Sequence, residues 1–340
     1  MKRPKNRVKE AINFFLSKIG LHLISIKKYQ RLCRRMLLHE QIICDSKRSQ
    51  KNTSKADQES SFFAFYRYGI LERKEKDGFN YLWMTHDEAG IFSCLTTAMW
   101  TVLQIRGEGQ ICHSIDNSFS MSSFKKNRQE NTWSKLFTPR SKVEIEAIMD
   151  SKPCSTLRFD HHGNYSEIVA KHLGIDWAKS YIKAYMTPSK NVQKIADFFI
   201  RKYEISERTT IAVCYRGTDK HKEVAPSPLS EYYAKVDEIL KSEPNCQILI
   251  QTDQKQVRDE FKKKYTNMCL FIEELPVTAR KIAIHKQHIK GLGKDKFAKH
   301  LYSMCIAISA SKYVITHTGN VGFFLALHTL LFKNTLIQLR

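Results

Sequence analysis

The 340-residue sequence lacks any run of the roughly 18 to 20 apolar residues that a membrane-spanning helix needs. Its basic start leads into no signal-peptide core with a small-residue cleavage site. Its nine cysteines show no CxxC spacing, which argues against a disulfide framework and a structural zinc site. It has neither a Walker Lys-Ser/Thr motif nor an evident metal-binding carboxylate pair. We therefore expect a cytoplasmic protein, in solution or peripheral to a membrane, with mostly buried thiols and no bound metal.

The composition and length are those of a folded protein. With 42% apolar and 11% aromatic residues, the chain can bury a full core in one large domain or two. Its net charge of +22 requires that polyanionic partners be considered. More than half of this excess lies in residues 1–56, which hold 15 Lys or Arg against three acidic residues. Such a one-sided distribution argues against a uniformly basic nucleic-acid-binding fold.

The basic end predicts a helical extension, residues 1–58. Residues 8–18 have a broad apolar helical face, Gly20 follows as a cap, and residues 21–38 continue in the same amphipathic style. Such a segment can lie on an anionic membrane or pack on the protein body, and the sequence leaves both open. Residues 45–60 are polar and predict a flexible linker.

Residues 59–200 predict an N-terminal α/β domain. Aromatic-rich strands at 62–66 and 79–83 flank Asp77 and Gly78, which favour a hairpin turn. The apolar run at 91–105 predicts a helix after Gly90, and residues 110–112 a strand that would complete a βαβ unit. Residues 117–140 are polar and predict an irregular loop.

Residues 201–340 predict a Rossmann-like domain with a parallel sheet. Apolar strands are expected at 209–215, 246–252, 268–272, 313–316 and 335–339. Helical patterns separate them at 229–241, 254–265, 296–309 and 321–332. Alternation of this kind requires parallel pairing with crossover helices.

Polar residues at three strand ends predict a nucleotide diphosphate site, because ligands of parallel sheets bind at the carboxyl ends of the strands. Arg216 follows the first strand of the domain, and Asp253 follows the second. Gly319 and Asn320 stand between a later strand and its helix. A guanidinium fork, glycine backbone N–H groups and a helix N-terminus all favour a phosphate.

Two histidine-rich segments have other interpretations. Asp160-His161-His162-Gly163 predicts a turn rather than a metal site, since adjacent histidines do not easily reach one ion. His285, His288 and His300 lie in a lysine-rich segment that we interpret as a mobile cover over the phosphates.

Three motifs resemble those of the α1,6-fucosyltransferases and their bacterial nodulation relatives. Residues 215–220, Tyr-Arg-Gly-Thr-Asp-Lys, followed by Glu223, are similar to the donor-site motif of that family. Residues 249–254 resemble its Ala-Thr-Asp-Asp strand end, and residues 314–321 its Cys-Thr-Phe-Ser-Ser segment. The motifs agree in order and spacing over about residues 205–330.

The resemblance implies a GT-B architecture, with two Rossmann-like domains facing across a cleft. It implies inverting transfer of fucose from GDP-fucose, or another nucleotide sugar, to a glycan or glycolipid hydroxyl, without a cofactor or metal. Arg216 would hold the donor phosphate, while Lys220 and Glu223 would be catalytic, with Glu223 as the base. The donor-binding positions would also include Asp219, Asp253, Thr318, Gly319 and Asn320.

Several positions depart from the family pattern. Cys214 replaces a ribose-contacting His, Gly217 a second Arg and Gln254 a second Asp. Gly319 replaces a Ser, and Glu223 aligns only after a one-residue deletion. These departures affect the expected sugar and base more than the reaction class. Two alternatives stay open: a nucleic-acid-binding protein with a basic N-terminal arm, and an inactive glycosyltransferase-like scaffold.

Overall fold

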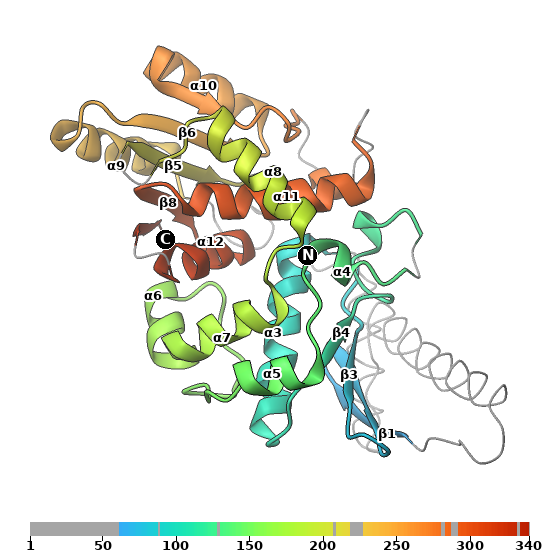
Figure 1. Cartoon of the computed structure of the whole chain (residues 1–340). Coiled ribbons are helices and arrows are strands. Elements are labelled where there is room, and N and C mark those ends of the chain that lie inside the picture. The colour runs from blue at the N-terminus through green and yellow to red at the C-terminus, as the bar shows by residue number, and fades with distance from the viewer. Residues whose placement is uncertain are drawn as a thin grey trace, which may run out of the picture. The chain divides into compact units, whose positions relative to one another are not determined.

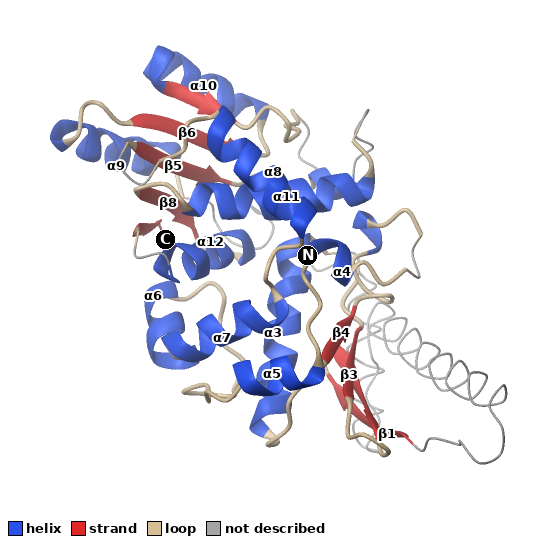
Figure 2. Cartoon of the chain, in the orientation of Figure 1, coloured by secondary structure: helices blue, strands red, loops and turns tan. Residues whose placement is uncertain are grey.

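The computed structural model describes residues 61–87, 89–127, 130–206, 209–217, 227–279, 283–286, 292–331 and 334–339. These residues belong to one compact unit, which begins at residue 60. Two separate sheets with helices around them give the unit a mixed α/β fold, as the sequence predicts (Figure 1, Figure 2). The predictions for the extension, residues 1–58, lie outside the described residues.

The first sheet has four strands in chain order: β1 (Ser61–Tyr66), β2 (Gly69–Lys74), β3 (Asn80–Met84) and β4 (Ser114–Asp116). Pairing is antiparallel between β1 and β2 and between β2 and β3, whereas β3 and β4 are parallel. The turn at Asp77 and Gly78 connects β2 to β3, and Gly78 has the left-handed φ of 61° that glycine adopts without strain. The predicted hairpin turn is confirmed, although residues 62–66 pair with β2 rather than β3.

A βαβ unit is also present, because α3 (Ile91–Gly107) leads from β3 to the parallel β4. The strand starts at Ser114, just after the predicted residues 110–112. The rest of this sheet differs from the predicted Rossmann-like arrangement. Two short turns fold its first three strands back on one another, and strands so connected pair antiparallel.

Helix α3 lies almost wholly in the interior, with thirteen of its seventeen residues buried. An all-round apolar helix of this kind belongs in a core. Its buried Thr96, Thr97 and Thr101 donate their hydroxyls to carbonyl oxygens of the preceding turn, each at 2.8 Å. These hydrogen bonds remove the cost of burying unpaired hydroxyl groups.

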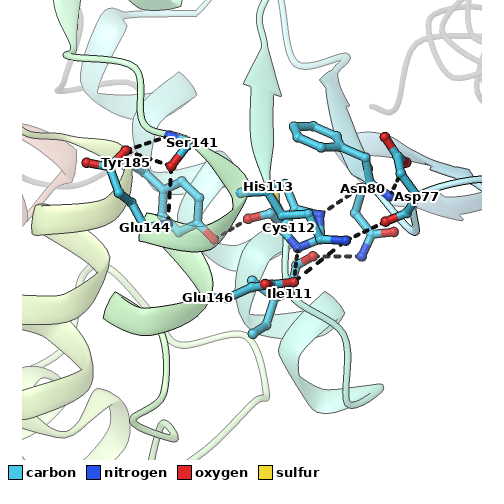
Figure 3. Close-up of polar contacts among 11 residues, drawn as sticks. Asp77, Asn80, Ile111, Cys112, His113, Ser141, Glu144, Glu146 and Tyr185 are labelled. Carbon is cyan, nitrogen blue, oxygen red and sulfur yellow. Dashed lines mark hydrogen bonds and ion pairs between the residues drawn. The ribbon is translucent and has the colours of Figure 1, made fainter.

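A buried histidine joins the first sheet to α5 (Lys142–Ile148), as Figure 3 shows. The Asn80 N–H donates to Nδ1 of His113 at 2.8 Å, and Nε2 of His113 lies 3.2 Å from Oε1 of Glu146. Because Nδ1 accepts, the proton of the neutral ring is on Nε2 and is donated to Glu146. Burial lowers the pKa of His113, which favours this neutral form.

We call the elements before β5 (Thr210–Tyr215) the first half of the unit and the elements from β5 onward the second half. The remaining helices of the first half are α4 (Trp133–Leu136), α6 (Tyr165–Glu167), α7 (Ile175–Tyr185) and α8 (Lys190–Lys202), with a π-helical segment at Ile168–Leu173. Within the predicted loop at 117–140, the described residues are irregular except for the short helices Ser122–Phe124 and α4. Helix α8 packs along α11 (Lys294–Ser309) and so connects the first half to the second (Figure 1).

The second sheet is fully parallel. Its strands are β5 (Thr210–Tyr215), β6 (Gln247–Thr252), β7 (Cys269–Phe271), β8 (Tyr313–His317) and β9 (Thr335–Leu339). They lie in the order β7-β6-β5-β8-β9. The helices are α9 (Leu229–Ser242), α10 (Lys255–Tyr265), α11 and α12 (Asn320–Leu331). Every strand and helix predicted for this half is present, with boundaries within two residues of those expected.

Both faces of the second sheet are covered, which explains its near-continuous apolar strands. In β5, Ile211 and Val213 pack with residues of α9 and α10, whereas Ala212 and Cys214 join the core that includes α11 and α12. That core continues into α3, because the rings of Phe92 and Phe324 lie 5.7 Å apart. The N-terminal ends of α3 and α12 are therefore positioned by one packed interior.

Of the seven cysteines among the described residues, Cys94, Cys112, Cys214, Cys246 and Cys305 are buried free thiols, as expected. No helix within the described ranges has both the length and the hydropathy to cross a bilayer.

Candidate functional site

The strand order of the second sheet reverses between β5 and β8. The connections that leave these two neighbouring strands run in opposite directions, which opens a crevice at their carboxyl ends. Arg216 comes directly after β5, and His317 ends β8, with Thr318 and Gly319 between that strand and α12. Two of the three predicted segments thus flank the topological switch point. The third, with Asp253, ends the adjacent strand β6.

Arg216 is held by Asp253. The Nε atom of Arg216 lies 3.7 Å from Oδ2 of Asp253, and the Gly217 N–H donates to Oδ1 at 3.2 Å. These two side chains are only 25% and 12% exposed, so the ion pair is partly shielded from water. The far nitrogens of the guanidinium face Gly90, where an added Cβ would lie 3.8 Å from both. Arg216 therefore reaches from the second sheet to the beginning of α3.

The turn after β8 is fixed by the buried Tyr165. Its hydroxyl lies 2.9 Å from the carbonyl oxygen of Gly319 and 3.1 Å from that of His317, and it accepts a hydrogen bond from the Gly319 N–H. Gly319 has a φ of 140°, which other residues rarely adopt. Burial raises the pKa of Tyr165, so it stays a neutral hydroxyl. Residues of the first half thus set the conformation at the start of α12.

A cavity of about 440 Å³ lies beside these residues, between the first and second halves. Its first wall carries Tyr68, His86, Ala89, Gly90, Ser93, Thr97, Trp100, Arg158, His161 and His162. Its second wall carries Arg216, His285, His317, Gly319, Asn320 and Val321. A smaller cavity of about 70 Å³ lies against the other side of Arg216 and includes Asp253.

Two long helices begin at the large cavity. Helix α3 starts after Gly90 and α12 starts at Asn320, and both positions line it. Neither helix has an acidic residue in its first turn, and α3 has no side-chain cap. The N–H groups of a first turn have no acceptors within the helix and carry the positive end of its dipole. Both helix ends therefore favour an anion in the cavity.

The side chains agree with this preference. Two arginines and five histidines line the cavity, and no Asp or Glu is among the described residues of its walls. Arg216 adds a planar donor fork suited to phosphate oxygens. Together these groups can bind an anion larger than a single phosphate.

The predicted site residues fall into three sets. Arg216, Gly319 and Asn320 line the large cavity. Asp253 and the half-buried Thr318 adjoin them without lining it. Asp219, Lys220 and Glu223 lie outside the described residues, as does His288. Of the other histidines from the lysine-rich segment, His285 lines the cavity, whereas His300 is buried in α11.

Sequence reasoning missed much of the first wall. The turn predicted at residues 160–163 is confirmed, since the His162 N–H donates to Oδ1 of Asp160 at 2.9 Å and the Gly163 N–H to its carbonyl oxygen at 3.0 Å. That turn also directs His161 and His162 to the cavity, beside Arg158. Nothing in the local sequence places these residues opposite Arg216. Within the described ranges, no three His, Cys, Asp or Glu side chains are grouped to hold a metal ion.

No family model and no curated protein matches the chain. Among solved structures it is similar to NodZ α-1,6-fucosyltransferase soaked with GDP-fucose, with a TM-score of 0.43 and 13% identity over 73% of this chain and 91% of that one. The fucosyltransferase NodZ from Bradyrhizobium matches with a TM-score of 0.42 and 10% identity, over 72% of this chain and 91% of that one. POFUT1 in complex with GDP matches with a TM-score of 0.31 and 11% identity, and the match covers 50% of this chain and about half, 53%, of that one. These likenesses are distant, so the function has to be inferred from the site itself.

Proposed function

We propose that this chain is a glycosyltransferase that binds the diphosphate of a nucleotide-sugar donor at Arg216. The observation that supports the proposal most strongly is that Arg216 and the first turns of α3 and α12 all line one cavity at the switch point. A diphosphate there would accept hydrogen bonds from the guanidinium and from helix N–H groups.

The same groups suit the chemistry of glycosyl transfer. As the bond between the anomeric carbon and the phosphate oxygen breaks, its electron pair and negative charge move to the diphosphate. Fixed donors already directed at that position stabilise the charge without reorganisation, which lowers the barrier. Arg216 is held in place by Asp253 and is therefore prepared for this role.

We propose GDP-fucose as the donor and an inverting, metal-independent reaction. These finer points rest on the motif resemblance of residues 215–223. An acceptor hydroxyl would attack the anomeric carbon from the face opposite the leaving GDP, and Glu223 would take the hydroxyl proton. Lys220 would orient the base or contact phosphate, and Asp219 and Thr318 would complete the donor side.

A ligand panel tests the proposed function. Full-length protein is heated with GDP, UDP, ADP, GDP-fucose and UDP-glucose, and the melting temperature is recorded against ligand concentration. A ligand that binds only the native state raises the melting temperature by mass action. We expect GDP and GDP-fucose to give the largest shifts. The absence of a shift with every nucleotide would contradict the proposal.

We also propose that the acceptor is a glycan or glycolipid and that residues 1–38 bind anionic membrane surfaces. Basic charge and an apolar helical face coincide in that segment. Flotation with vesicles containing phosphatidylserine tests this. Equal flotation of the full chain and of a chain that begins at Ser60 would contradict it.

A further inference from the structure

The large cavity extends along one side of α3. Gly90, Ser93, Thr97 and Trp100 all line it, and this spacing repeats once per helical turn. Since an α-helix rises about 1.5 Å per residue, the Trp100 end lies about 15 Å along the helix from Gly90. Gly90 is the position that faces Arg216. The cavity therefore has a donor end, at Gly90 and Arg216, and a distal end at Trp100.

The distal end has its own cationic cluster. The guanidinium carbon of Arg158 lies 4.2 Å from the ring centroid of Trp100 and 5.8 Å from that of Tyr68. The ring of His161 lies 5.6 Å from that of Trp100. Arg158, Trp100, Tyr68 and His161 all line the cavity. This distal cluster is built from the turn between β1 and β2, α3 and the 158–162 segment.

Arg158 is available for a ligand. Among the described residues, no carboxylate lies within ion-pair distance of its guanidinium, and its side chain is exposed. The guanidinium carbon lies 4.2 Å and 5.8 Å from the ring centroids of Trp100 and Tyr68, distances at which a cation is attracted to an aromatic ring. The planar guanidinium can bind a carboxylate or phosphate in bidentate fashion through its N–H groups.

One diphosphate does not account for both ends. Arg216 lies beside Gly90, whereas Arg158 and His161 lie beside Trp100, nearly three helical turns further along α3. A second negative charge at the distal end would be held by groups that the donor diphosphate leaves unused. An acceptor hydroxyl has to reach the donor sugar, so an acceptor would bind in the same cavity, and the distal end is the part that lies away from Arg216.

We propose that the distal cluster binds the acceptor and that this acceptor carries an anionic group, a carboxylate or a phosphate, which Arg158 holds. The inference rests on the proposed function, because it takes the other end of the cavity to hold the donor. It narrows the acceptor to acidic or phosphorylated saccharides.

Calorimetric titration of the full-length protein tests this proposal. The protein is saturated with GDP and titrated with galactose, galacturonic acid or galactose 6-phosphate, which differ only in the group at carbon 6. We expect both anions to bind at least about tenfold more tightly than galactose, and the tighter of the two identifies the anionic group. Arg158→Gln should abolish the preference while the Kd for GDP changes less than about twofold.

Arg67→Gln is the matched control. The guanidinium carbon of Arg67 also lies near the Tyr68 ring, at 5.2 Å, but Arg67 does not line the cavity. Arg67→Gln removes the same charge as Arg158→Gln, and we expect this control variant to keep the preference for the two anionic sugars over galactose. Equal binding of the three sugars, or a loss of GDP binding in Arg158→Gln as large as the loss of anion binding, would overturn the inference. Failure of the wild type to bind GDP at all would instead contradict the proposed function, and an anion preference could still be measured in its absence.

Discussion

The Nε atom of Arg216 lies 3.7 Å from Oδ2 of Asp253, and the other oxygen of this carboxylate accepts the Gly217 N–H at 3.2 Å. One carboxylate thus holds both the side chain of Arg216 and the backbone that follows it. Asp253 does not line the large cavity, whereas Arg216 does. We therefore interpret Asp253 as a positioning residue that acts on the donor through Arg216.

A double-mutant cycle tests this interpretation. Asp253→Asn removes the charge that orients the guanidinium, and we expect GDP to bind about five- to tenfold more weakly. In an Arg216→Ala background the same substitution should have almost no effect, because residues that act as a unit are not additive. Titration calorimetry of the four proteins measures the coupling. A full Asp253→Asn effect in the Arg216→Ala background would show that Asp253 contacts the donor itself.

We expect one added methyl group at the beginning of α3 to weaken donor binding. Gly90→Ala places a Cβ 3.8 Å from both terminal nitrogens of Arg216, in space that a phosphate would use. Gly293 is a matched control, because it precedes α11 with nearly the same backbone angles and an added Cβ there meets nothing within 4 Å. We expect Gly90→Ala to weaken GDP binding about tenfold and Gly293→Ala to leave it unchanged, with similar melting temperatures. Equal affinities of the two variants for GDP would show that the start of α3 is not part of the donor site.

Stability should decrease in mild acid. Burial lowers the pKa of His328 from 6.5 to about 4, and it also lowers the pKa values of His113 and His300. Between pH 6.5 and about pH 4, His328 is protonated in the unfolded chain, whereas burial keeps it neutral in the folded chain. The stability present above pH 6.5 is therefore lost as the pH falls towards 4, by up to about 3 kcal/mol for His328.

Urea unfolding at pH 7.5 and at pH 5 measures this loss. His328→Gln should reduce the difference between the two pH values, since a glutamine does not titrate. The half-buried His172, changed to Gln, serves as the control and should leave the difference intact. An unchanged pH dependence in His328→Gln would contradict the assignment.

Glu223 is the proposed base, so its amide variant should separate binding from turnover. We expect Glu223→Gln to lower kcat by about 10² or more and to leave the Kd for GDP within twofold, because a positioned base acts in the transition state and does not contact the nucleotide. Transfer assays and calorimetry on one preparation give both values. Near-normal turnover would move the base to another residue.

The second half of the fold could be predicted because its signals are local. The strands, such as β5, are short apolar runs, and a helix follows every one of them except β9, the last element. Parallel pairing of the strands then follows from the helical connections between them. In the first half, the aromatic residues of β1 and β3 identify strands but do not determine their partners. Pairing there depends on the two short turns, so the mostly antiparallel sheet could not be predicted from periodicity.

The candidate site was predictable on one wall only. Arg216 and Gly319 stand at strand ends, which is a sequence signal, whereas Arg158 and Tyr165 reach the site through contacts with residues more than fifty positions away. The structure also relates two departures from the family pattern. An added Cβ at Gly217 would lie 2.7 Å from the side-chain oxygen of Gln254, so these two residues pack against each other.

The central claim is that Arg216 holds a donor diphosphate with its planar fork. The most direct test is the Kd for GDP of wild type, Arg216→Lys and Arg216→Ala, measured by calorimetry in EDTA, with Arg201→Lys as a surface control. Lysine keeps the charge but loses the bidentate geometry, and hydrogen bonds to charged groups contribute about 1.5 to 3 kcal/mol. We expect both Arg216 variants to bind GDP at least tenfold more weakly than wild type and the control to bind normally. Wild-type affinity in Arg216→Lys would contradict the claim.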